Sequence, residues 1–330
     1  MEEDIACSGF FAAQADGTIS CLDKFESGGA LQWILGNLLE AIYNLIYAVS
    51  HPSLWLDWVT WGNTTEDKQS LLRFVYYGAS VEFFFVMFVL VLIVSAIGFW
   101  RNDIMWGYVR GLEGFANRLG RIMGWSGLVM VMLQIVIIFL QRVFAVSQIS
   151  FGFGMVVTFD VSWWSESLKF YNALIVTMCA TYTFVQGGHV RVDLVYSNIS
   201  YRAKKAVDMF GSIVFMIPTA VVVWLYGWFF MWRHLMVPNV SASDTLDKVM
   251  RKAPAVKWNV ETIGFSPNGF NAYFLFKMLL LGYTALVMLH ALAFFYRSYL
   301  ERKEGMASEG KYLDKDKLGD PQAELVAEIH

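Results

Sequence analysis

The sequence predicts an all-α membrane protein, a polytopic helix bundle with five to six transmembrane helices. Hydrophobic residues form 57% of the 330 residues and charged residues only 16%, whereas a soluble globular domain is usually about 25% charged. Five long apolar runs separate the charged residues, and each is close to the ~20 residues with which a helix crosses a bilayer. Tryptophans such as Trp100 and Trp232 stand near the ends of these runs, as interfacial anchors do.

Net charge, cysteines and the N-terminus disfavour several other classes of protein. The net charge is -3, so no basic field exists to attract nucleic acid and no such partner is expected. The first residues, Met1–Ile5, are acidic, where a secretory signal peptide would be basic, and we expect no cleavage. The cysteines Cys7, Cys21 and Cys179 follow no metal-ligand spacing, so neither a disulfide framework nor a zinc site is expected.

The apolar runs predict the membrane spans. The first run extends from Phe74 to Trp100 and contains one charge, Glu82. We interpret Glu82 as a carboxylate at the membrane boundary, because charges that are truly buried in a bilayer are rare. The other four runs contain no Asp, Glu, Lys or Arg, and they are Ile122–Gln141, Phe170–Gly188, Met209–Trp232 and Met278–Tyr296.

A sixth segment, residues 31–50, has two possible placements. Its polar residues recur every three or four positions, which puts them on one face of a helix; they are Gln32, Gly36, Glu40, Asn44 and Tyr47. Such a helix either lies in the membrane interface or spans the bilayer with its polar face against protein. The sequence leaves both placements open.

Lysines and arginines predict the orientation, because cytoplasmic loops carry more of them. Residues 143–168 contain neither, whereas 101–121 and 189–208 each contain several. We therefore expect 101–121 and 189–208 in the cytoplasm, 143–168 outside, and a mobile cytoplasmic tail over 300–330. The 233–277 loop then lies outside although it is basic, since long loops can cross regardless of charge.

The sequence does not point to catalysis. No nucleophile triad, carboxylate pair, phosphate loop or metal cluster occurs in it, and we predict no enzyme, no cofactor and no metal. The apolar runs carry no Asp, Glu, Lys or Arg at mid-depth, where a carrier's own pathway needs polar groups. We expect a support for another subunit's pathway. The alternative is a haem- or quinone-binding membrane anchor of a redox complex, with His189 and His290 as candidate haem ligands.

The most informative motif lies between the third and fourth runs. There, H-V-R-V-D over residues 189–193 is followed by Arg202 and by Asp208 at the start of the next run. This pattern resembles the small, DctQ-like membrane subunit of tripartite ATP-independent periplasmic (TRAP) transporters. Upstream, Ser162–Leu168 resembles the family's W-x-E-E-L segment, in which only one of the two acidic positions, Glu166, is present.

The resemblance covers a four-span core over residues 111–299. Residues 1–110 are an N-terminal extension, with a helix over 31–50 and a span over 74–100, like that of the larger family members. The candidate subunit interface consists of the motif residues Glu166, His189, Arg191, Asp193, Arg202 and Asp208. Arg191 and Asp193 are predicted to order the cytoplasmic turn; ordinary anchoring at the membrane surface is the alternative.

The resemblance also implies partners. In this family a periplasmic binding protein captures an organic acid, and a large permease subunit moves it with an ion gradient across the bacterial inner membrane. The small subunit resembles a scaffold for that permease, surrounded by membrane lipids. The candidate docking surface for the binding protein is the basic cluster of Lys248, Arg251, Lys252 and Lys257; a solvated loop face is the equally open alternative.

Overall fold

The computed structural model confirms an all-α, multi-pass membrane protein. It describes residues 6–12, 18–60, 62–78, 80–152, 156–187, 199–241, 243–259, 269–270 and 272–315. In this part of the chain, five helices are long and apolar enough to cross a membrane. The chain forms two compact units, the first from residues 1–100 and 236–258 and the second from 101–235 and 259–330. The first unit therefore combines residues from the N-terminal part of the chain with residues from the loop between the fourth and fifth candidate spans.

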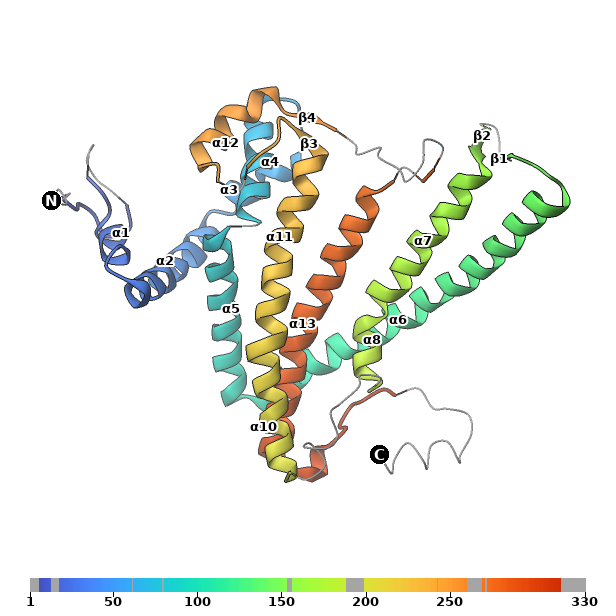
Figure 1. Cartoon of the computed structure of the whole chain (residues 1–330). Coiled ribbons are helices and arrows are strands. Elements are labelled where there is room, and N and C mark those ends of the chain that lie inside the picture. Colours follow the sequence, from blue (N-terminus) through green and yellow to red (C-terminus); the bar gives the residue numbers. More distant parts are fainter. Residues whose placement is uncertain are drawn as a thin grey trace. The chain divides into compact units, whose positions relative to one another are not determined.

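The first unit contains α1 (Cys21–Glu26), α2 (Ala30–Ser50), α3 (Pro52–Leu56), α4 (Thr65–Tyr77), α5 (Val81–Trp100), α12 (Leu246–Lys252) and the short antiparallel pair of β3 (Met236–Val237) and β4 (Lys257–Trp258). α2 packs against α5 through Ala41, Phe85 and Val89, and in Figure 1 the two helices cross rather than run side by side. α4 and α12 pack together beyond the N-terminal end of α5.

The run predicted over 74–100 is divided in the structure. α4 ends at Tyr77, and α5 begins only at Val81. Glu82 therefore lies in the first turn of α5, where the unpaired N–H groups of the helix favour a carboxylate. This position agrees with the interpretation of Glu82 as a boundary residue.

The N-terminal residues contain a disulfide between Cys7 and Cys21. The expectation that these cysteines form no disulfide is wrong. The chain folds back so that the Ser8 N–H donates to the Ile19 carbonyl and the Cys21 N–H to the Gly9 carbonyl. This return brings the two Cα atoms to 4.9 Å, within the usual range for a disulfide; spacing along the chain did not reveal it.

The second unit contains α6 (Asn102–Ile138), the hairpin of β1 (Gln148–Phe151) and β2 (Val157–Asp160), α7 (Val161–Met178), α8 (Ala180–Val185), α10 (Tyr201–Gly211), α11 (Ile217–Leu235) and α13 (Phe274–Glu304). The hairpin joins α6 to α7, which pack together, while α10 and the described end of the chain lie at the opposite end of this unit (Figure 1). A π-helical turn at Ser212–Met216 links α10 to α11. It directly precedes Pro218, which has no N–H to continue a regular helix.

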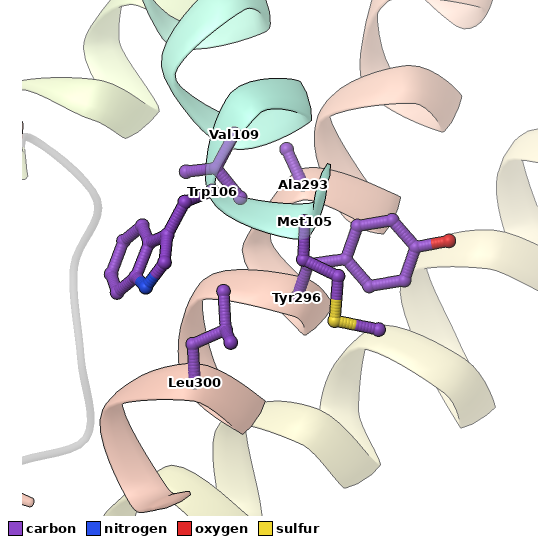
Figure 2. Close-up of a cluster of buried hydrophobic side chains, with 6 residues drawn as sticks. All are labelled: Met105, Trp106, Val109, Ala293, Tyr296 and Leu300. Carbon is purple, nitrogen blue, oxygen red and sulfur yellow. The ribbon is translucent and has the colours of Figure 1, made fainter. Parts of the chain in front are cut away.

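The helices extend well beyond the apolar runs that predicted them. Residues 102–121, which belong to the segment expected in the cytoplasm, form the first half of α6. One face of this half packs on the C-terminal half of α13 in a hydrophobic cluster of Met105, Trp106, Val109, Ala293, Tyr296 and Leu300, shown in Figure 2. The tail boundary expected at residue 300 falls inside α13, which continues to Glu304.

Candidate functional site

A buried network of charges adjoins the hydrophobic cluster of α6 and α13. The guanidinium of Arg297 on α13 donates to both carboxylate oxygens of Glu113 on α6, at 2.6 and 2.5 Å. Arg297 also forms an ion pair with Glu301 at 3.2 Å, and Glu301 forms a second ion pair, at 2.6 Å, with Lys205 on α10. Glu113, Arg297 and Glu301 are 5%, 7% and 2% exposed. We call these four residues the charge network.

The helical spacing of these residues explains why they meet. Arg297 and Glu301 are four residues apart and lie on one face of α13. Glu113 follows Val109 by four residues, so it continues the α6 face that packs on α13. The planar guanidinium matches a carboxylate with two parallel hydrogen bonds, and this pairing compensates for the desolvation of both charges.

The end of the described chain covers the network. The Lys311 carbonyl accepts a hydrogen bond from Arg297 at 3.2 Å, and the Asp314 carbonyl accepts one from Asn117 at 2.7 Å. Gln186, just after α8, donates to the same Asp314 carbonyl and to the Asn117 side chain, each at 3.1 Å. Residues 305–315 thus connect α6, α8 and α13.

The hydrogen bonds of Gln186 and the ion pair of Lys205 attach both ends of the segment that carries the H-V-R-V-D motif. Gln186 precedes this segment and is tied to Asn117 and Asp314. Lys205 follows it and is tied to Glu301. His189, Arg191 and Asp193 themselves lie outside the described residues. These contacts attach the end of α8 and the start of α10 to the other helices of the unit. The paired charges therefore have a structural role.

The other predicted interface residues lie apart from the network. Glu166 on α7 accepts a hydrogen bond at 2.9 Å from the Phe270 N–H, and so connects α7 to the chain that leads into α13. Arg202 is exposed on α10, and Asp208 lies half-buried further along the same helix. The structure therefore gives Glu166 a bridging position and does not bring it together with Arg202 or Asp208.

The predicted docking cluster is organised around a buried carboxylate. Asp244 is 3% exposed and pairs with Lys248 at 2.7 Å and with Lys252 at 2.5 Å. The hydrogen bond from Lys248, followed by those from Lys252 and the Ser241 N–H, holds the pKa of the Asp244 carboxyl well below its usual range. Arg251 and Lys257 are exposed. Two of the four basic residues therefore neutralise Asp244 and stabilise α12.

Of the two histidines considered as haem ligands, the structure describes only His290. His290 is buried on α13 beside Phe184, with the ring centroids 5.8 Å apart. His189, the second candidate ligand, lies outside the described residues. In the part of the chain that the structure describes, no group of three or more His, Cys, Asp or Glu residues is arranged to hold a metal ion.

Sequence reasoning missed the charge network. None of Glu113, Arg297 and Glu301 was considered as a member of a site, and Arg297 only marked the end of the last apolar run. The signals that could have found the network were the spacing of Arg297 and Glu301 and the presence of Glu113 within the basic 101–121 segment. Neither feature indicates which helix the charged side chain faces. The ion pair between α6 and α13 was therefore not predictable.

Comparison with protein-family models, with curated proteins and with solved structures gives no match for this chain. The functional assignment therefore depends on the motif of residues 189–208 and on the properties of the helices.

Proposed function

We propose that this protein is the non-catalytic small membrane subunit of a TRAP-type secondary transporter. In this role it scaffolds a large permease subunit in a bacterial inner membrane. The permease takes up an organic acid that a periplasmic binding protein delivers, driven by an ion gradient. The observation that carries the proposal is the H-V-R-V-D motif, with Arg202 and Asp208 after it, between two apolar helices.

The surfaces of the helices support a scaffolding role. In the apolar windows of the five candidate spans, only 6% to 28% of the residues are buried within the chain. The second half of α6 is the extreme case, at 6%. Helices that bury so little of one another leave wide apolar faces for lipid and for a membrane-embedded partner.

The positions of the buried charges support the non-catalytic part of the proposal. Among the described residues, the buried Glu113, Lys277, Arg297 and Glu301 lie outside the apolar runs. Charged Asp, Glu, Lys or Arg groups that mark a substrate or ion pathway would instead lie near the midplane. The charge network clamps α6, α10 and α13 together, as suits the stationary part of a carrier.

Copurification tests the proposal. The tagged protein is extracted from native membranes in mild detergent, and the proteins that accompany it are identified by mass spectrometry. We expect a large permease with many spans. Redox subunits, or a Soret band in the visible spectrum, would instead support the haem- or quinone-binding anchor.

Asp193→Ala tests the motif directly. We expect it to lower the amount of permease recovered while the substrate affinity of the remaining complex is unchanged, because charges at the membrane surface are readily hydrated and act structurally. Glu66→Ala, an exposed substitution in the other unit, is the control and should leave recovery unchanged. Normal assembly with an altered substrate preference would contradict the structural role.

A further inference from the structure

α2 carries a continuous aliphatic stripe that the chain does not cover. Its members recur every three or four residues, are between 46% and 77% exposed, and lie on one face of the helix; they are Leu31, Leu35, Leu39, Ile42, Ile46 and Val49. A water-soluble helix shows the opposite pattern, with its aliphatic face buried.

The opposite face of α2 is turned toward protein. Gly36, Asn37 and Ala41 are buried there, and Trp33 meets Phe85 of α5 with ring centroids 5.5 Å apart. Glu26 of α1 packs so closely on Gly36 that a Cβ at this position would lie 2.3 Å from its side chain. The buried residues of α2 therefore lie on the protein side, and the Asn37 side chain donates to the Trp33 carbonyl of the same helix at 2.9 Å, while the aliphatic stripe points away.

The C-terminal end of α2 lies on the outer side of the membrane. α2 leads through α3 and α4 to the start of α5, and the charge distribution places that start outside, since Arg101, Arg110 and Arg118 follow α5. The packing of α4 on α12 agrees, because α12 belongs to the loop between α11 and α13, which the alternation of the spans places outside although the loop is basic.

The N-terminal end of α2 lies on the outer side too. The Cys7–Cys21 disulfide immediately precedes α2, and disulfides form and persist in oxidising compartments such as the periplasm and are rare in the cytosol. With both ends on the same side, α2 cannot cross the membrane. This agrees with its absence from the five helices that qualify as spans among the described residues.

We propose that α2 lies in the plane of the outer leaflet and binds the lipid surface through its aliphatic stripe. Tyr43 and Tyr47, 41% and 43% exposed, border the stripe on one side, and Trp55 of α3 adds a third exposed aromatic ring. Aromatic rings of this kind belong at the headgroup level, and aliphatic side chains belong among the upper acyl chains. This inference does not depend on the transporter assignment.

Two cysteine experiments test the placement, in a Cys179→Ala background that keeps the native disulfide. The first labels Ser27→Cys and Ser50→Cys, exposed positions at the two ends of α2, with a membrane-impermeant maleimide on spheroplasts. Both should label from outside, while the control Glu309→Cys should label only after permeabilisation. Labelling of only one end would show that α2 spans the bilayer and would overturn the proposal.

The second experiment measures depth. The full chain carrying bimane at Leu39→Cys is reconstituted into vesicles that contain nitroxide lipids. We expect roughly twofold greater quenching by a nitroxide near the headgroup than by one near the chain end, because an interfacial helix inserts only ~5–10 Å. Bimane at Ser27→Cys is the control and should be weakly quenched by both. Absence of quenching at Leu39→Cys would mean that water, a second copy or another protein covers the stripe, and would overturn the proposal.

Discussion

Arg297 is paired with two carboxylates, those of Glu113 and Glu301, in a setting from which water is largely excluded. A buried pair of this kind adds little net stability over well-packed apolar residues. Removal of one member is costly, because it leaves the partner charge buried and uncompensated. The network is therefore more sensitive to single substitutions than surface ion pairs are.

Arg297→Met should lower the free energy of unfolding by about 3–5 kcal/mol, since Glu113 stays buried without its partner and Glu301 keeps only its ion pair with Lys205. The measurement is denaturation in detergent micelles. Lys303→Met is the matched control on the same helix; Lys303 makes an exposed hydrogen bond to Asn102, so the expected loss is at most ~1 kcal/mol. Equal losses in both variants would show that the network is not buried as described.

Asp244 gives a prediction about pH. Its folded pKa is depressed by Lys248 and Lys252, so the pairing stabilises α12 at pH values above the unfolded pKa of about 3.9. This stability is lost as the pH falls through the lower folded pKa. The protection of the α12 amides, measured against the exchange rate of an unstructured chain at the same pH, should therefore fall in acid.

Asp244→Asn should give fast exchange in α12 already at neutral pH and remove most of the acid dependence. Asp247→Asn, at an exposed position in the same helix, should behave like the unmodified protein. An unchanged acid response in Asp244→Asn would assign the effect to another group.

At the level of elements, residues 305–315 act as a strap that connects Asn117 of α6 with the C-terminal ends of α8 and α13. Asn117, which is 1% exposed, depends on Asp314 for its acceptor. A strap of this kind keeps α8 close to α6 at the point where the chain leaves for the motif segment.

Ending the chain after Glu309 should loosen this junction. Exchange of amides near Asn117 and Gln186 should become roughly tenfold faster, because a buried polar group without its partner costs about 1–3 kcal/mol. Ending the chain after Lys315 keeps every contact of the strap and serves as the control. If both truncations behaved alike, the strap would not stabilise the junction.

At the level of the whole molecule, the positions of the basic residues predict one orientation of the chain in the membrane. Basic residues follow α5, lie within α10 and end α13, and residues 143–168 carry no Lys or Arg. These positions predict a cytoplasmic C-terminal end and an external β1–β2 hairpin.

Alkaline phosphatase fusions check this orientation. Fused after Gly152, in the hairpin, the enzyme should be active because it reaches the oxidising outer side. Fused after Lys315, it should be inactive, while a fluorescent protein at the same position should be bright. The reverse pattern would contradict the orientation and, with it, the placement of α2.

Much of the architecture was predictable because it depends on local chemistry. Long uncharged runs must be helical in a bilayer, where each backbone polar group needs a partner within its own segment. The five helices therefore follow from composition and the spacing of charges alone. The ends of these helices do not follow from composition. α6 and α13 extend past their apolar runs where they pack on each other, as at Val109 and Leu300.

The sequence by itself determined the class of protein, the number of apolar helices, the expected orientation and the motif on which the proposed function depends. Only the tertiary structure decided that Glu113 meets Arg297, that Cys7 meets Cys21, and that the stripe of α2 stays uncovered. Helical period tells which residues share a face. Which faces meet depends on the summed packing of segments far apart in the chain, and no single segment contains that information.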